Sequence, residues 1–586
     1  MSRGRSMLFK TVALFLSPAG ASLVDHGLRH RLQGKLLQGL LWLVPAVALA
    51  APDAGSVLQQ LEPRPAAPAF KVPSLQTPQA PTASAEDAGG PVLHVQAFEL
   101  EGTTLLDADL LQRALAGFVN RDLSLTQLQE AAWVVIQTYR EAGWLVNAFV
   151  PPQEIEQGRV RIQVVEARLG QVLLDIQPSV RIEGAQILAL VQGQIQSGEP
   201  LNLARVDSAL MLIDELAGVR AAASFAPSQT EGATDLVVVI GGGKPVDLSF
   251  SLDNHGARST GARRLSTNLG FNSMLGMGDL LTVNLVNTDG STYQRAAYSL
   301  PVGNQGLRVG LHSADMNYVF AWNNTPIAGF ARNQGLDLSG PWLRNASSRW
   351  SWSLSTDHKR LQNSANEAVT SDYRIDVARA ALNGSWQDSA LTLTQNTLGI
   401  TLTDGQVHNP ADITGVHGRF RKINLTYNRE QGITDNLSGF VQAQTQSASR
   451  NLDSSEKLFL GGATGVRAYP ANEVGGASGY AATLGLRQRL DRGLTVSGFV
   501  DWGRVSLCRE QLSDCLKDKA GGGKEPAVQA LQGHGLSLAW QNEQGLDLSA
   551  TWSRRRGHHP NPDANGLDSD QTRIINRLWL SAAVRY

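Results

Sequence analysis

Two stretches decide the fold: Gly465-Val466-Arg467-Ala468-Tyr469-Pro470 and, further along the chain, Phe499-Val500-Asp501-Trp502-Gly503. The second lies in a segment with a period of two, so we predict a β-strand. One face carries Leu494, Val496, Val500 and Trp502, and the other carries Thr495, Ser497, Phe499, Asp501 and Gly503. The first stretch lies in a Gly- and Ala-rich segment, which predicts a long loop. Our hypothesis is that Arg467 reaches into a barrel and pairs with Asp501 on its inner wall. The alternative is two unrelated surface charges.

The same alternation extends through residues 242–586. Apolar and polar residues alternate over 246–253, over 546–553 and over 577–586, where Trp579 is the exception. Turn signals such as Asp289-Gly290 separate the segments. We predict a membrane all-β barrel of about sixteen antiparallel strands. A soluble β-sandwich is the alternative, but polar residues persist along one face over a long region, as a watery lumen permits. In lipid, only a closed barrel pairs the backbone groups of every strand.

The amino terminus is predicted to be an extended signal peptide at residues 1–50. An apolar run from Leu40 to Ala50 follows a basic lead, and Ala48-Leu49-Ala50 gives a small-x-small cleavage pattern. A membrane anchor is the alternative, but the run is short and contains Pro45. No later stretch stays apolar over the roughly 18 residues that a membrane helix needs.

A short helix and a linker follow. Residues 51–62 contain the amphipathic segment Ala54 to Leu61, which alone would be marginal in water. Residues 63–91 are rich in Pro, Ala, Ser and Thr, so we predict an extended linker. The helix is therefore either a removable plug or a disordered leader.

Two small α+β modules are predicted in tandem, at residues 92–170 and 171–241. The first shows the order β-α-α-β-β, and its second helix is predicted to begin with a capping box from Thr126 to Gln129. The second module repeats a similar order. A small mixed sheet leaves an edge that can accept an added strand from an extended partner.

Composition and motifs exclude several functions. The net charge is -1, so no basic nucleic-acid surface is indicated. Gly241 to Lys244 and Gly521 to Lys524 lack the spacing of a phosphate-binding loop. No Gly-x-Ser-x-Gly motif occurs, and His558-His559 has no nearby Cys or carboxylate apart from Asp563. We predict no catalytic residue, no cofactor, no metal site and no enzymatic activity.

The chain has two cysteines, Cys508 and Cys515. In an oxidising compartment they could close a short loop as a disulfide. Two free thiols are the alternative.

The order of these parts resembles the outer-membrane transporters of bacterial two-partner secretion, the haemolysin and filamentous-haemagglutinin secretion/activation proteins. Val466-Arg467-Ala468-Tyr469 resembles their Val-Arg-Gly-Tyr loop motif, and Phe499, Asp501 and Gly503 match their Phe-x-Asp-x-Gly strand motif. Residues 253–256 resemble their first barrel hairpin, and the ends of both modules resemble polypeptide-transport-associated (POTRA) domains. Ala468 departs from the family's glycine, which matters if the position needs a positive φ. Tyr586 replaces the commoner terminal Phe.

The resemblance implies a function. The POTRA domains would catch an unfolded partner exoprotein in the periplasm, and the barrel would pass it through the Gram-negative outer membrane without ATP. The partner would be an adhesin, a haemolysin or a contact-dependent toxin. The helix at 51–62 and the loop around Arg467 would occupy the resting pore of a monomer embedded in the lipid bilayer. An insertase for other barrels and a passive porin are the alternative functions.

Overall fold

The computed structural model describes much of the chain after the predicted signal peptide. The described residues are 52–62, 74–75, 92–230, 232–322, 324–345, 347–388, 394–412, 415–509, 527–557, 559, 562 and 566–586. The predicted signal peptide at 1–50 lies outside them, as do most of the linker, Cys515, His558 and Asp563. None of the described helices is both long enough and apolar enough to cross a bilayer.

The first module is an α+β unit. Its elements are β2 (Leu93–Val95), β3 (Ala97–Glu101), α3 (Ala108–Leu115), β4 (Arg121–Leu123), α4 (Leu125–Glu141), β5 (Val146–Phe149) and β6 (Arg159–Glu166). A capping box between Ser124 and Gln127 starts α4, so the predicted box at Thr126 to Gln129 is wrong in position, although the motif type is right. The sheet has the order β3-β6-β5. The strand β4, which the sequence analysis missed, pairs with β2.

The second module has a similar set of elements, and a short strand from the linker joins its sheet. Its elements are β7 (Arg168–Ile176), α5 (Gly184–Gln192), α6 (Leu203–Asp214), β8 (Val219–Pro227) and β9 (Ala233–Gly242). The linker segment β1 (Ser74–Leu75) pairs in parallel with β8, with Ser74 opposite Ala222. The sheet order is therefore β1-β8-β9-β7, and an edge of this sheet accepts an extended segment of the chain.

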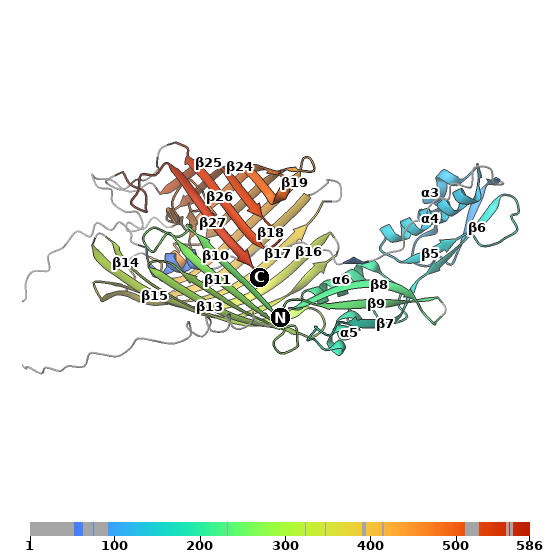
Figure 1. The fold of residues 1–586 in the computed structure, drawn as a ribbon, viewed down its shortest axis with the longest axis horizontal. Coiled ribbons are helices and arrows are strands. Elements are labelled where there is room, and N and C mark those ends of the chain that lie inside the picture. The colour runs from blue at the N-terminus through green and yellow to red at the C-terminus, as the bar shows by residue number, and fades with distance from the viewer. Residues whose placement is uncertain are drawn as a thin grey trace, which may run out of the picture. The chain divides into compact units, whose positions relative to one another are not determined.

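The remaining long strands of the described chain close into one antiparallel barrel of sixteen (Figure 1). They are β10 (Val246–Asp253), β11 (Arg264–Asn272), β12 (Leu280–Asn287), β13 (Ser291–Val302), β14 (Leu307–Trp322), β15 (Thr325–Arg344), β16 (Ser348–Ala365), β17 (Ala368–Trp386), β18 (Thr394–His408), β19 (Gly418–Gly432), β20 (Leu437–Ala448), β23 (Ser478–Arg489), β24 (Leu494–Ser506), β25 (Val528–Gln541), β26 (Leu546–Arg555) and β27 (Asn576–Arg585). The first strand, β10, closes the barrel against the last, β27. The predicted fold class is confirmed.

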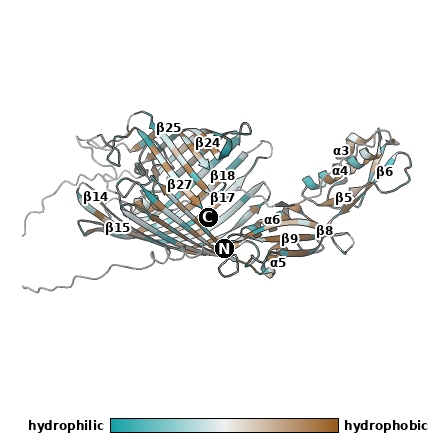
Figure 2. Cartoon of the chain, viewed as in Figure 1, coloured by the Kyte–Doolittle hydropathy of each residue, from teal (hydrophilic) through white to brown (hydrophobic). Residues whose placement is uncertain are grey.

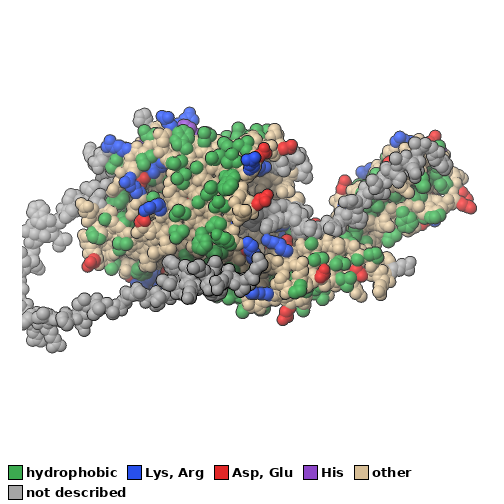
Figure 3. Space-filling view, in the orientation of Figure 1, with side chains coloured by type: hydrophobic (Ala, Val, Ile, Leu, Met, Phe, Trp, Pro, Cys, Tyr) green, Lys and Arg blue, Asp and Glu red, His purple; other side chains and the backbone are tan. Residues whose placement is uncertain are grey.

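The two faces of the barrel wall differ as a membrane protein requires. In β14, Leu311 and Val319 are exposed on the outer face, whereas His312 and Met316 are buried on the inner face. Hydropathy varies residue by residue along the strands (Figure 2), and apolar side chains spread over the visible outer wall (Figure 3). The outer surface therefore suits lipid.

Aromatic side chains mark one rim of this surface. They are Trp342, Trp350, Trp386 and Tyr427, near the strand turns on the side where the chain enters the barrel from β9. Trp350 and Trp386 stack with their ring centroids 5.8 Å apart, and Trp342 meets Trp350 edge-on. Amphipathic aromatic rings of this kind belong at a membrane–water interface.

Candidate functional site

The loop between β20 and β23, residues 449–477, folds back into the barrel and is called the pore loop. It contains the short 3-10 helix η2 (Ser454–Glu456) and a stem in which β21 (Leu458–Leu460) pairs with β22 (Val474–Gly476). The motif Val466-Arg467-Ala468-Tyr469 forms its tip. Val466, Ala468 and Tyr469 are buried in one apolar cluster with stem and wall residues. The apolar motif residues thus hold the tip in place around Arg467.

The structure brings Arg467 at this tip against Asp501 on the inner face of β24. The guanidinium donates two hydrogen bonds, from Nη2 to Oδ1 at 2.6 Å and from Nε to Oδ2 at 2.9 Å. The backbone N–H of Arg467 adds a third, to Oδ2 at 3.1 Å. Asp501 is 1% exposed. A bidentate, charge-assisted contact fixes direction as well as distance, so it defines where the loop tip lies.

Neighbouring wall residues complete the site. Thr483 Oγ1 donates to Asp501 Oδ1 at 2.8 Å, and the Arg467 guanidinium lies over the Phe499 ring, 3.2 Å from its centroid. Phe499 of the strand motif therefore packs on the cation that Asp501 neutralises. Because β23 and β24 both supply partners, the pair is fitted to this wall and is no chance contact of surface charges.

The backbone carbonyl of Arg467 is also hydrogen-bonded to the wall. It accepts from Ser553 Oγ at 2.6 Å and from Trp579 Nε1 at 2.7 Å. The sequence alone predicts no role for Trp579, although this residue breaks the alternation of the last strand. That break was the available signal, because it places a large indole on the inner face.

Small residues let the loop tip approach the wall. A Cβ at Gly503 would lie 2.8 Å from Leu460 Cδ2, and a Cβ at Gly533 would lie 2.6 Å from the Ala468 Cβ. Gly503 of the strand motif is thus needed for close packing rather than for backbone freedom. Ala468 is not among the described residues with positive φ. The alanine that replaces the family's glycine therefore fits without strain.

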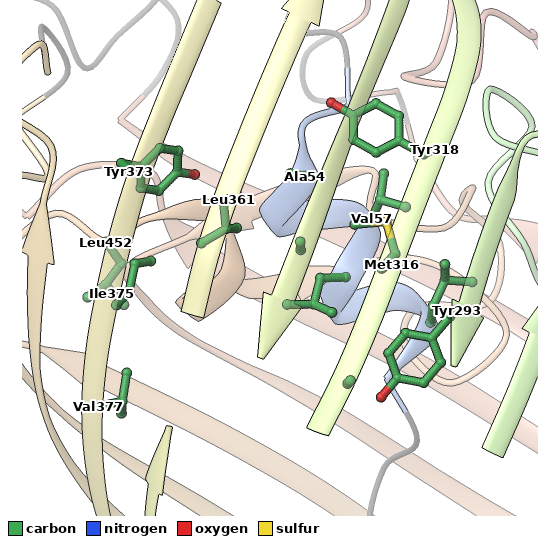
Figure 4. Close-up of a cluster of buried hydrophobic side chains, with 14 of the residues drawn as sticks. Ala54, Val57, Tyr293, Met316, Tyr318, Leu361, Tyr373, Ile375, Val377 and Leu452 are labelled. Carbon is green, nitrogen blue, oxygen red and sulfur yellow. The ribbon is translucent and has the colours of Figure 1, made fainter. Parts of the chain in front are cut away.

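The short helix α2 (Ala54–Leu61) also lies inside the barrel. Asp53 and Ser56 form its capping box. Its apolar face packs on the inward side chains of β14, β16 and β17, as Figure 4 shows for Val57 beside Met316. Leu58 is 1% exposed. The inner wall therefore carries a patch of apolar side chains on which the helix docks.

Polar contacts fix the position of α2 along the wall. The Ala54 N–H donates to Asn363 Oδ1 at 2.7 Å, and Gln59 Nε2 donates to the Lys457 carbonyl at 2.8 Å. A Cβ at Gly55 would lie 2.7 Å from the Ser455 backbone nitrogen. The helix thus touches the pore loop closely at η2, so the two occupants of the lumen are in direct contact.

A buried carboxylate anchors η2 to the wall. Glu456 is 2% exposed and receives Lys359 Nζ at 2.7 Å, Lys422 Nζ at 2.8 Å and Arg379 Nη2 at 3.0 Å. Removing one partner of such a group leaves uncompensated charge in a dry site. No sequence pattern indicates this cluster, because its members come from three strands and a loop with no shared motif.

Cys508 is disulfide-bonded, and Cys515, the other cysteine of the chain, lies outside the described residues.

His559, for which the sequence offers no nearby acidic ligand but Asp563, lies near two carboxylates in the structure. Its Nε2 is 2.5 Å from Glu473 Oε1 and 3.3 Å from Asp568 Oδ1. These three groups could hold a metal ion, but Asp568 already pairs with Arg555 and Arg577.

A closed barrel whose lumen holds a helix and an ion-paired loop, behind tandem α+β modules, defines a transport channel of an outer membrane. The chain matches the family of the haemolysin secretion/activation proteins ShlB/FhaC/HecB over residues 232–522 and the ShlB-type POTRA domain over residues 93–167. The chain belongs to this family of two-partner secretion transporters. The predicted outer-membrane location is confirmed, and the first module is a POTRA domain.

Individual relatives agree with this assignment. The heme/hemopexin transporter protein HuxB of Haemophilus influenzae is 26% identical over 443 residues, which are 72% of this chain and 78% of HuxB. The outer membrane transporter CdiB of Escherichia coli is 25% identical over 67% of this chain and 68% of CdiB. Family members are transporters, so the predicted transport function is confirmed.

Solved structures share the fold. CdiB from Escherichia coli superposes with a TM-score of 0.63 at 21% identity, covering 86% of this chain and 93% of that one. BamA from Haemophilus ducreyi lacking POTRA domains 1-3 gives a TM-score of 0.51 at 12% identity, covering 84% of this chain and 100% of that one. These likenesses concern the fold alone.

Proposed function

We propose that this protein is a monomeric, normally shut export channel that releases α2 and the pore-loop tip when its own secreted exoprotein arrives. The partner is an adhesin, a haemolysin or a contact-dependent toxin, and the transporter itself performs no enzymatic step. The observation that carries the proposal is the occupied lumen. A helix and a loop, each held by contacts that can be broken without unfolding a strand, fill the path that a polypeptide would take.

Capture begins in the periplasm. The second module has the same α+β composition as the first, and we propose that it is also a POTRA domain. The pairing of β1 with β8 supports strand addition as the mode of capture, because an extended segment fits an edge of this sheet. In the first module, β5 is an edge strand, and Trp133, Ile136 and Phe149 line an adjoining groove. An extended exoprotein segment with apolar side chains would suit this edge.

Passage requires the lumen to empty. The pore-loop tip would retract when the contact between Arg467 and Asp501 breaks, and α2 would leave through the periplasmic side on its linker. The unfolded partner would then thread past polar wall residues and fold outside. Folding on the far side makes the movement one-way without a nucleotide.

The test is export of the cognate exoprotein by Arg467→Ala and Asp501→Ala variants. Both should insert as folded barrels yet lose most export, because the loop tip would no longer be directed to its place. The matched control is Arg360→Ala, which removes an exposed ion pair to Asp372 between two wall strands. Export by both variants at the level of the control would refute the role of the pair.

The alternative function, an insertase for other barrels, predicts a different effect of depleting this protein. An insertase serves many barrels, so its depletion should lower many outer-membrane proteins at once. An export channel predicts loss of one secreted partner with the other outer-membrane proteins unchanged. Quantitative comparison of outer-membrane proteins with and without this chain distinguishes the two functions.

A further inference from the structure

The seam between β10 and β27 is a shorter join than the one on the other side of the last strand. Five residue pairs link β10 to β27, from Ser249 opposite Arg585 to Asp253 opposite Ser581. Nine pairs link β26 to β27. The first half of β27 therefore extends beyond the end of β10, and its backbone groups on that side need other partners. In lipid, unpaired groups of this kind are costly.

Asn254, the first residue after β10, supplies those partners. Its backbone N–H donates to the Leu580 carbonyl at 3.2 Å, and its Oδ1 accepts from the Leu580 N–H at 2.8 Å. Its Nδ2 donates to the Leu578 carbonyl at 2.9 Å. The side-chain amide thus provides the acceptor and the donor that a longer β10 would have provided.

Because the surroundings are apolar, the backbone groups of β27 need the Asn254 side chain as a hydrogen-bond partner. Leu578 and Leu580 are 53% and 46% exposed on the outer face of β27, where the barrel meets lipid. Their inward neighbour Trp579 lies on the opposite face. The backbone between the two leucines is therefore at the lipid boundary, and the Asn254 amide is what pairs it on the β10 side.

Adjacent residues hold Asn254 in position. Asp253 receives Arg264 in two hydrogen bonds, at 2.8 and 3.1 Å, and also accepts from the His255 N–H at 2.8 Å. These contacts fix the direction in which the chain leaves β10. The His255 ring meets the Trp579 ring edge-on, with centroids 5.9 Å apart.

Trp579 connects the seam to the pore loop. Its indole N–H donates to the carbonyl of Arg467, as described above. The closing strand therefore touches the seam through its backbone and the loop tip through its side chain.

We propose that Asn254 is a positioning residue that clamps the loop-bearing end of the barrel seam and keeps the export path inside the lumen. An aspartate at this position keeps the acceptor for Leu580 but loses the donor for Leu578. An alanine loses both. The requirement for an amide of this length follows from the two different partners on β27.

The experiment is hydrogen exchange on the full chain in detergent micelles. In Asn254→Ala, exchange of the Leu580 amide should quicken on the order of tenfold, because its acceptor is lost, while β19 and β20 keep their wild-type rates. Asn254→Asp should leave the Leu580 amide protected. The matched control is Asn268→Ala, which removes a contact to Ser249 on the other side of β10 at 3.2 Å.

A cross-link separates loss of the acceptor from opening of the seam. Leu252 and Ala582 are opposite each other in the seam, so a disulfide between Leu252→Cys and Ala582→Cys should hold the seam closed in Asn254→Ala, while the Leu580 amide, which still lacks its acceptor, keeps exchanging fast. Wild-type exchange at Leu580 in a folded Asn254→Ala barrel would overturn the proposal. An equal rise on β19 and β20 would also overturn it, because the effect would then be a general loss of stability.

Discussion

The two occupants of the lumen are held in different ways. The helix α2 docks mainly through apolar side chains, among them Val57, Leu58 and Leu61, and its polar contacts include neutral groups of the wall and the pore loop. The pore-loop tip is held by an ion pair between Arg467 and Asp501. The helix continues into a linker, whereas the loop is tied at both ends by its stem. In the proposed function, the helix leaves the barrel during export, whereas the loop shifts within it.

Two kinds of contact are enough to shut a channel without a separate gate. Apolar docking is not directional, so it tolerates repeated departure and return. A bidentate ion pair is directional, so it returns a tethered loop to one place. The helix and the loop tip should therefore be released by different substitutions.

Asp501→Ala should release the loop tip while leaving α2 docked. Breaking one side of a buried ion pair typically costs about 3–5 kcal/mol, since the remaining charge loses its partner. Proteolytic cleavage after Arg467 should then become rapid, and the same assay on Asp372→Ala should match the wild type. A tip that stays protected in Asp501→Ala would show that the apolar cluster alone holds it.

Gly55→Val should instead release α2 while leaving the pore-loop tip in place. The added side chain would collide with the backbone of η2, and the docking of residues such as Leu58 would be lost, at about 2–5 kcal/mol for one buried leucine. Ion conductance through planar bilayers should rise, while protection of Arg467 from protease should fall far less. Gly117→Val is the control, because a Cβ there meets nothing within 4 Å. Unchanged conductance would contradict the plug role of α2.

Outside the membrane, Glu166 makes a further stabilising contact, within the first POTRA domain. Burial raises the pKa of its carboxyl, but hydrogen bonds from Thr104, Leu105 and Tyr139 outweigh that effect and hold the pKa below the ordinary value of 4.5. A depressed folded-state pKa stabilises the domain above pH 4.5, and this stability is lost as the pH falls through the folded-state value.

Glu166→Gln should therefore cost about 1–2 kcal/mol at pH 7, a range kept low because water partly screens this site, and much less at strongly acidic pH. The measurement is urea unfolding of the full chain in detergent, followed through limited proteolysis of the POTRA region at both pH values. An equal loss at the two pH values would mean that the carboxylate charge is not what holds the loop at Thr104.

Trp579→Phe should produce the smallest change. It keeps an aromatic ring but removes one hydrogen bond to the Arg467 carbonyl, worth about 1 kcal/mol. Protease cleavage of the loop tip should accelerate a little, and Ser553→Ala, which removes the other donor, should act similarly. Conductance should not change in either variant. A large rise in conductance would mean that the loop, and not α2, is the main barrier.

Much of this architecture could be predicted from the sequence, because strand periodicity is local. The alternation around Asp501 places the carboxylate on the inner face, and the motif around Arg467 supplies its partner. The exception at Trp579 was visible for the same reason. The short strand β4 was missed, because a strand of three residues leaves too little pattern to detect.

Contacts made across the barrel could not be predicted. Glu456 meets lysines and an arginine from three strands, and nothing in their spacing indicates it. Asn254 contacts a strand at the far end of the chain, so its role depends on barrel closure and on the relative lengths of β10 and β27. The contact of His559 with Glu473 follows the same rule, since Glu473 is distant in sequence.

The proposed export route requires α2 to leave the barrel, and a reversible cross-link tests this directly. Val57 and Met316 face each other in the apolar cluster (Figure 4), so Val57→Cys and Met316→Cys together should form a disulfide that ties the helix to the wall. Export should stop in the oxidised protein and return on reduction, while the wild type exports equally in both states. Undiminished export with the cross-link intact would contradict the proposed departure of α2.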